Sequence, residues 1–166
     1  MKQPTSLKMQ ADRRLWIMGL TAGLGVGILA AWPRSGKAAR GPLVEVWKSP
    51  SCGCCQVWIE HLESHGFSTR VHDVGNTAKR AQMGIALVHG SCHTAVVEGY
   101  AIEGHVPARE IQRLLKEKPR AIGLAVPGMP MGSPGMDGPE YGPRRDPYDV
   151  LLLQRAAAPT VYQSYR

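Results

Sequence analysis

The chain has 166 residues, a formal net charge of +7, 43% hydrophobic residues and four cysteines, a composition that suits one compact domain with an appendage. Residues 1–40 hold seven of the 20 Lys/Arg residues and one of the 13 Asp/Glu residues, so residues 41–166 carry 13 basic and 12 acidic side chains. The body of the protein is therefore nearly neutral, which excludes nucleic acid as its partner.

Residues 1–40 have the layout of an export signal. An uncharged run at residues 15–32 follows the Arg13-Arg14 pair, and small residues suited to cleavage come after it, for example Ala38-Ala39. We therefore expect residues 1–40 to direct the protein to the periplasm, by the twin-arginine or the general secretory route, and then to be removed. The alternative is an uncleaved N-terminal anchor, because residues 15–32 lie at the lower edge of a membrane-spanning length. In that case this run is the only membrane contact of a periplasmic domain at residues 41–166.

Three of the four cysteines lie on a turn between a predicted strand and a predicted helix. Residues 43–47 alternate as a strand does, and apolar residues recur at helical spacing over residues 58–62. The cysteines between these segments are Cys52, Cys54 and Cys55. A helix N-terminus presents unpaired N–H groups and the positive end of the helix dipole, which favour thiolate. This thiol turn is therefore suited to binding soft metals or to attacking disulfides.

The segments that follow predict a mixed α/β domain. Their periodicity and turn signals give a helix end near residues 65–66, a strand at 67–74, a helix from 76 or 77 to 84, a strand entered through 85–90 and running to 97, a hairpin partner at 100–103 and a helix at 108–118. With the first strand and helix, this is the element order of a thioredoxin-like domain. In that arrangement Cys92 lies opposite the thiol turn and closes over the other three cysteines.

The composition changes after residue 123. Residues 127–136 hold three methionines among prolines and glycines, and they have neither helical nor strand periodicity. Residues 148–154 and 160–165 then have the pattern of two strands of a closing hairpin. The predicted fold is therefore a thioredoxin-like α/β domain with a Met/Pro/Gly-rich loop and a C-terminal β-hairpin.

The spacing of the cysteines favours metal binding over structural disulfides. Cys54 and Cys55 are adjacent and Cys52 is two residues away, so few unstrained pairings exist within the cluster. Adjacent side chains on a helix diverge, which makes Cys54 and Cys55 poor partners on one ion but suits sulfurs that bridge several ions. Thiolates select soft ions such as Cu(I), whereas structural zinc usually takes four sulfurs from two Cys-x-x-Cys turns.

The same turn contains Cys52-x-x-Cys55, the spacing of thioredoxin-type redox sites. In this alternative the protein is a thiol-disulfide oxidoreductase, with Cys52 as the nucleophile and Cys55 as the resolving thiol. A dithiol exchanger has no use for Cys54 and Cys92, however, because two further thiols within reach invite scrambled disulfides. A combined role, in which the thiols or the cluster change the oxidation state of copper, is also open.

Five sequence blocks stand out in order along the chain: Cys52-Gly53-Cys54-Cys55, Ser91-Cys92-His93-Thr94-Ala95, Gly99-Tyr100, Glu103-Gly104-His105-Val106-Pro107 and Gly123-Leu124-Ala125-Val126-Pro127-Gly128-Met129-Pro130. Together they resemble the CopG-like family of periplasmic proteins, which are often encoded with copper-resistance genes. The resemblance covers about residues 43–153. It implies a thioredoxin-like fold and a site of several Cu(I) ions bridged by Cys52, Cys54, Cys55 and Cys92. The implied function is copper binding for resistance or homeostasis, rather than a conventional enzyme activity, with copper ions and other periplasmic copper-handling proteins as partners.

Thioether and imidazole groups are secondary candidates. Met129, Met131 and Met136 are candidate metal contacts that pass Cu(I) to the cluster, or else they line a lid packed over it. His93 follows Cys92 directly, and it is a candidate ligand or a donor to sulfur, with a purely structural role as the alternative.

Other histidines and tryptophans are expected to be structural. His105 should cap or orient the turn that follows it. His61 and His65 are one helical turn apart, a spacing that can chelate a metal ion, but on a polar helix face we expect them to be solvated. Trp47 and Trp58 flank the cysteines in sequence. They are expected either to shield the site from water or to pack in the core.

Overall fold

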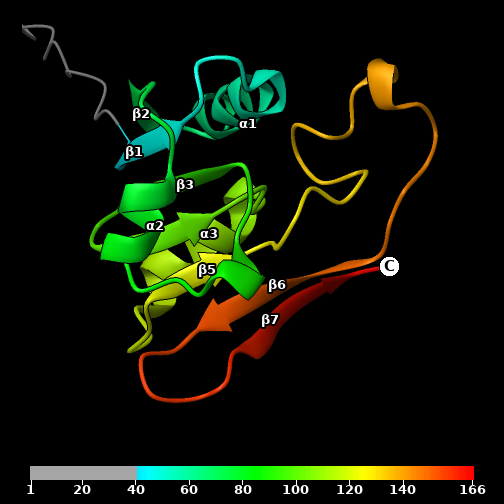
Figure 1. The fold of residues 1–166 in the computed structure, drawn as a ribbon. Coiled ribbons are helices and arrows are strands. Elements are labelled where there is room, and N and C mark those ends of the chain that lie inside the picture. Colours follow the sequence, from blue (N-terminus) through cyan, green and yellow to red (C-terminus); the bar gives the residue numbers. More distant parts are fainter. Residues whose placement is uncertain (1–40) are drawn as a thin grey trace, which may run out of the picture. The chain divides into compact units, whose positions relative to one another are not determined.

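The computed structural model describes residues 41–166, so the predicted export signal or anchor at residues 1–40 lies outside the described part. The elements are, in chain order, β1 (Leu43–Lys48), α1 (Gly53–Ser64), β2 (Ser68–His72), α2 (Thr77–Gln82), the 3-10 turn η1 (Leu87–His89), β3 (His93–Val97), β4 (Tyr100–Glu103), α3 (Ala108–Glu117), β5 (Gly123–Ala125), the 3-10 turn η2 (Pro139–Tyr141), β6 (Tyr148–Leu153) and β7 (Thr160–Tyr165). The strands form one seven-stranded sheet in the order β2-β1-β3-β4-β5-β6-β7 (Figure 1). Among residues 41–166, no helix is both long and apolar enough to cross a membrane.

The sheet mixes parallel and antiparallel pairs. β1 pairs in parallel with β2, with α1 as the crossover between them, and antiparallel with β3. β3 and β4 form the expected hairpin, and its turn residues Glu98 and Gly99 have φ angles of 45° and 84°. Two positive φ angles give a turn whose twist matches that of the flanking strands. The predicted α/β class is confirmed, and the order from β1 to α3 is compatible with a thioredoxin-like arrangement.

α1 presents one apolar stripe to the core. Its buried residues recur at helical spacing: Cys55, Trp58, Ile59 and Leu62. The last three belong to the main hydrophobic cluster, together with Val44 and Val46 on the inner face of β1. Cys55 is thus the first residue of the buried stripe, whereas Cys52 and Cys54 on the same turn are half-buried. Core packing therefore fixes one side of the thiol turn and leaves the other side accessible.

Two segments differ from the sequence prediction. Residues 87–89 form η1, and the third strand begins only at His93. Cys92 therefore lies just before the strand and not within it. The sequence also failed to predict β5, whose three residues are all buried and therefore show no alternation. β5 pairs in parallel with β4 and antiparallel with β6, so it joins the C-terminal hairpin to the rest of the sheet.

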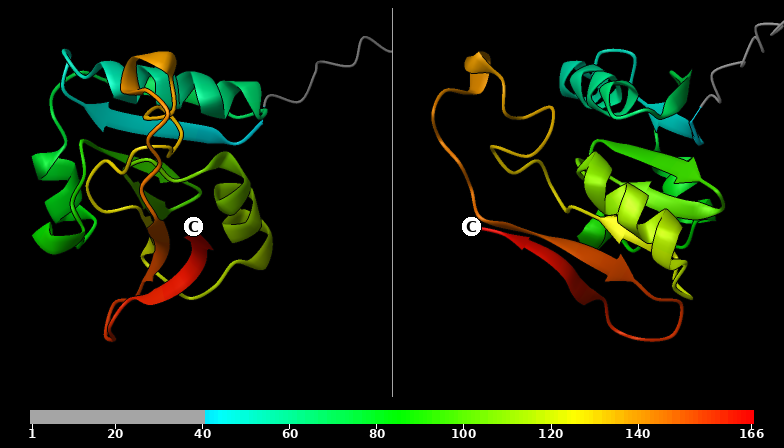
Figure 2. Two further views of the ribbon diagram at one scale, coloured as in Figure 1. Left: turned by 90° about the vertical axis from the view of Figure 1, so that its right-hand side faces the viewer. Right: turned by 180° about the vertical axis from the view of Figure 1, so that it is seen from behind.

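The predicted C-terminal hairpin is present as the antiparallel pair of β6 and β7. The Met/Pro/Gly-rich loop runs between β5 and β6 and includes η2. In Figures 1 and 2 this loop, drawn in yellow and orange, leaves the sheet toward α1 and then returns to β6. The loop therefore brings residues distant in sequence to the helix that carries the thiol turn.

Candidate metal centre

The thiol turn is set by short-range contacts. The N–H group of Cys52 donates to the carbonyl of Ser49, 3.1 Å away, and closes the turn after β1. Cys52 is the N-cap residue of α1, with extended backbone angles and no hydrogen bond from its side chain to the helix. The first turn of α1 also contains no acidic residue. The N-terminus of α1 is therefore left uncapped by a carboxylate or hydroxyl, next to the sulfurs.

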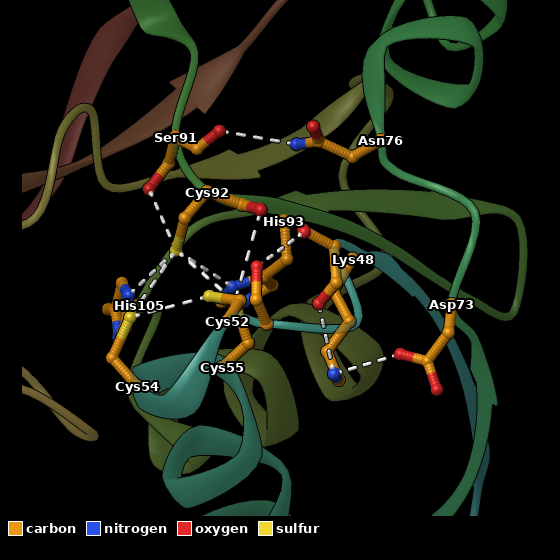
Figure 3. The surroundings of a disulfide bond; sticks show 12 residues. Lys48, Cys52, Cys54, Cys55, Asp73, Asn76, Ser91, Cys92, His93 and His105 are labelled. Carbon is orange, nitrogen blue, oxygen red and sulfur yellow. Dashed lines mark hydrogen bonds and ion pairs between the residues drawn. A yellow bond between two sulfur atoms is a disulfide. The ribbon is translucent and has the colours of Figure 1, made fainter.

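The structure brings the four cysteine sulfurs together within 4.8 Å of one another (Figure 3). The Sγ atoms of Cys52 and Cys54 are 3.5 Å apart, those of Cys55 and Cys92 are 3.5 Å apart, and those of Cys54 and Cys92 are 3.9 Å apart. Cys52 and Cys55 form a disulfide, while Cys54 and Cys92 are free thiols. The paired cysteines are the two that the redox alternative names. Cys92 is the only member of the cluster that comes from outside the thiol turn.

His105 lies against Cys92, although the sequence predicted only a role in the following turn. Its Nδ1 atom is 2.7 Å from the carbonyl oxygen of Pro134, and its Nε2 atom is 3.0 Å from Cys92 Sγ. A carbonyl can only accept, so Nδ1 carries the proton of the neutral ring. The lone pair of Nε2 therefore points at Cys92 Sγ, where it can accept the S–H proton or bind a soft cation. Burial lowers the pKa of His105, which favours this neutral form.

His93 is the second imidazole at the site. Its ring is fully buried and tilted against Trp58, with 4.2 Å between the ring centroids, and its Nδ1 atom is 3.4 Å from Cys92 Sγ. Its Nε2 atom has no hydrogen-bond partner among the described residues. Burial, with His105 beside it, lowers the pKa of His93 and keeps the ring neutral. Cys92, His93 and His105 thus form a second group of donors within 4.8 Å of one another.

Cys92 is a protonated thiol at neutral pH. Burial, followed by the effect of the neighbouring Cys54, raises the pKa of Cys92 to about 12. The helix dipole favours thiolate at the N-terminus of α1, whereas Cys92 precedes β3 and is not at a helix N-terminus. A metal ion bound by this sulfur must therefore displace its proton.

The Met/Pro/Gly-rich loop packs on the thiol turn through Pro134 and Gly135. Gly135 has a φ angle of +86°, and a Cβ atom on it would lie 2.6 Å from the carbonyl oxygen of Cys54 and 3.2 Å from Nδ1 of His105. Of the three candidate methionines, Met136 is buried beside this contact, Met131 is half-buried and Met129 is 49% exposed. The loop thus combines a close backbone contact at the site with one thioether side chain at the protein surface.

The two tryptophans have different surroundings. Trp58 is fully buried, packs on His93 and donates its indole N–H to the carbonyl of Val106 at 2.9 Å. It therefore covers one side of the donor group. Trp47 instead stacks on His72, with 4.5 Å between ring centroids, and the Lys79 ammonium lies over its other face.

His61 has a structural contact that the sequence did not predict. Its Nε2 atom accepts the N–H group of Ala108, the first residue of α3, at 3.1 Å. The ring therefore caps α3 from α1. His65, the residue that follows α1, is exposed as expected.

Comparison with known proteins places these features in a family. Residues 89–136 match a family described as Protein of unknown function, DUF411. No match was found among curated proteins. A solved structure of Copper resistance protein CopG, form 2, is 40% identical to this chain with a TM-score of 0.70, and the match covers 76% of this chain and 99% of that one. The form 1 structure is 42% identical with a TM-score of 0.68, and the match covers 74% of this chain and 96% of that one. On this evidence the chain belongs to the CopG-like family of copper resistance proteins.

Proposed function

We propose that the protein binds copper in the periplasm for copper resistance, and that it holds several Cu(I) ions bridged by Cys52, Cys54, Cys55 and Cys92. The observation that carries this proposal is the convergence of four sulfurs from two separate segments within 4.8 Å. Thiolates are the ligands that soft ions such as Cu(I) prefer. The name Copper resistance protein CopG, which both similar solved structures carry, supports copper as the ion.

The position of Cys92 supports more than one ion. Its sulfur belongs to both donor groups, one with three cysteines and the other with His93 and His105. A sulfur that belongs to two donor groups is placed to be shared between ions. The complete donor set, four sulfurs and two imidazoles, also exceeds the four ligands of one tetrahedral ion. Met136, Met131 and Met129 are proposed as secondary contacts during loading.

The disulfide between Cys52 and Cys55 favours redox chemistry as a second candidate function. Its reduction to two thiolates takes two electrons, which two Cu(I) ions supply when each becomes Cu(II). The reverse reaction, from two Cu(II) ions and two thiolates, restores the disulfide and two Cu(I) ions. Such an exchange would tie the number of sulfur ligands to the oxidation state of copper.

The redox function could also take the form of thiol-disulfide exchange with other proteins. A thioredoxin-type pair at Cys52 and Cys55 should reduce insulin disulfides, and should do so equally well after Cys54→Ser. We expect negligible insulin reduction by the metal-free wild-type protein, because Cys54 lies 3.5 Å from Cys52 and competes for the mixed disulfide. Robust turnover that survives Cys54→Ser would favour the oxidoreductase.

Anaerobic titration of the reduced protein with Cu(I) tests the copper proposal. We expect more than one copper per chain, and a sharp loss of stoichiometry or affinity in Cys92→Ser, because Cys92 is the only thiol that comes from outside the thiol turn. A competition titration with zinc should leave Cu(I) bound. Binding of a single ion, or displacement of Cu(I) by zinc, would contradict the proposal.

A further inference from the structure

A buried carboxylate outside the donor set holds the segment that carries Cys92. Glu103, the last residue of β4, is fully buried. Its Oε1 atom accepts the N–H group of Ser91 at 2.7 Å and the Nε–H group of Arg80 at 2.8 Å. Its Oε2 atom accepts the hydroxyl of Thr94 at 2.6 Å. The carboxylate therefore bonds to residues on both sides of Cys92.

The carbonyl of Ser91 is also held by side chains. It accepts one hydrogen bond from the Nη2 group of Arg80 and another from the Nδ2 group of Asn76. The contact with Asn76, at 3.2 Å, is drawn in Figure 3. This carbonyl belongs to the peptide unit that joins Ser91 to Cys92. Because β3 begins only at His93, side chains hold this peptide unit in place of a strand partner. One guanidinium thus bonds to both Glu103 and Ser91, as the fork geometry of arginine allows.

We propose that Glu103, together with Arg80, is a positioning residue that fixes the sulfur of Cys92 for sharing between metal ions. The two side chains act on Cys92 through Ser91 and Thr94. The importance of this placement for copper rests on the proposed function. The placement itself concerns the metal-free protein and can be measured without copper.

The network needs a carboxylate and not merely a polar side chain. Three donors point at the two oxygens of Glu103, whereas the amide of glutamine has only one oxygen and turns an N–H group toward at least one of those donors. Glu103→Gln also leaves the guanidinium of Arg80, whose side chain is only 12% exposed, without its counter-charge. We therefore expect this substitution to release the Ser91-Cys92 peptide unit.

Glu110 supplies a matched control. It is also a buried glutamate, with 5% of its side chain exposed, and it accepts from Arg109 and Tyr165 on the α3 side of the molecule. Glu110→Gln therefore removes a comparable buried charge without touching the Cys92 segment. The double variant Arg80→Met/Glu103→Gln removes both charges together, and it tests positioning in a protein that has no unpaired buried charge.

The first measurement is alkylation of the metal-free full chain by N-ethylmaleimide, with the Cys52–Cys55 disulfide intact and the free thiols resolved by peptide mass mapping. We expect Cys92 to react about tenfold faster in Glu103→Gln and in the double variant, since each loses a charge-assisted hydrogen bond to the segment. Cys54 should change much less, and Glu110→Gln should match the wild type. Equal Cys92 rates in all four proteins would overturn the positioning role.

The second measurement is the copper content and X-ray absorption of the same variants after reduction. We expect Glu103→Gln and the double variant to bind fewer ions and to lose the short copper–copper vector, while Glu110→Gln keeps both. If Cys92 reacts faster but the copper content and the short copper–copper vector are unchanged, Glu103 positions Cys92 in the metal-free protein, and the idea that this positioning is needed for sharing the sulfur between ions is wrong. The two ideas therefore fail separately.

Discussion

At the scale of single residues, Cys92 differs chemically from the cysteines of α1. It precedes β3, its sulfur is flanked by His93 and His105, and burial raises its pKa to about 12. In the absence of metal it therefore carries a proton throughout the neutral range. That proton competes with copper.

Cys92 should make copper affinity depend on pH. Below about pH 12 copper binding to this sulfur must displace its one proton, so affinity should rise with pH by about tenfold per unit for this residue alone. Competition titrations with a Cu(I) chelator at about pH 6, 7 and 8 would measure the slope. Cys92→Ser should lower the slope by about one proton. An unchanged slope would mean that Cys92 does not bind copper as a thiolate.

At the scale of elements, the Met/Pro/Gly-rich loop reaches the thiol turn through a contact that tolerates only glycine. Gly135 has a φ angle of +86° and no room for a Cβ atom beside Cys54 and His105. Gly66, which follows α1, has a φ angle of +87° and open space around it. Both glycines have a left-handed backbone, but only Gly135 also lies in close contact with other residues.

Gly135→Ala and Gly66→Ala should separate these effects. Both should lower the free energy of unfolding by about 1–2 kcal/mol from the left-handed backbone. Gly135→Ala should also displace the loop and reduce copper loading, because the new methyl group meets the backbone of the thiol turn. Urea unfolding and copper content of both variants provide the comparison. Equal copper loading in Gly135→Ala and Gly66→Ala would show that the contact between the loop and the thiol turn does not affect copper binding.

His61 links α1 to α3 and should make stability depend on pH. Burial, and then the nearby His65, lower the pKa of His61 below its usual 6.5, while Asp137 acts in the opposite direction. The unfolded chain thus binds the proton more readily than the folded chain does. Stability from His61 is therefore fully present above pH 6.5 and is lost as the pH falls through the lower, folded value.

His61→Gln tests this link, because a glutamine oxygen can still accept the N–H group of Ala108. We expect the free energy of unfolding of the wild type to fall more than that of His61→Gln between about pH 7.5 and about pH 5. His93 and His105 titrate in both proteins and cancel in the difference. Parallel pH profiles would show that His61 does not carry the effect.

Local sequence patterns predicted the elements with clear periodicity, and long-range contacts decided the rest. β1, α1 and the hairpin of β6 and β7 have their own alternation or apolar stripe, and all are confirmed. β5 is too short and too uniformly buried to show a pattern. His105 was missed as a neighbour of Cys92 because the β3–β4 hairpin joins them across 13 residues. The capping role of His61 depends on Ala108, 47 residues away, and no local signal reveals it.

At the scale of the whole molecule, most of the net positive charge lies in residues 1–40, which agrees with the basic start of an export signal. Residues 41–166 contain the sheet, the sulfurs and the loop. We therefore expect the mature protein to lack residues 1 to about 40. Mass spectrometry of protein from the periplasmic fraction would measure its N-terminus, and an intact Met1 in the membrane fraction would favour the anchor.

The central claim, that copper ions share the cysteine sulfurs, is tested most directly by X-ray absorption of the reduced protein loaded with Cu(I) to saturation. We expect sulfur-dominated coordination and a short copper–copper vector, because Cys92 belongs to both groups of donors and the four cysteine sulfurs lie within 4.8 Å of one another. Isolated copper with mainly nitrogen ligands and no copper–copper vector would contradict the shared-sulfur cluster.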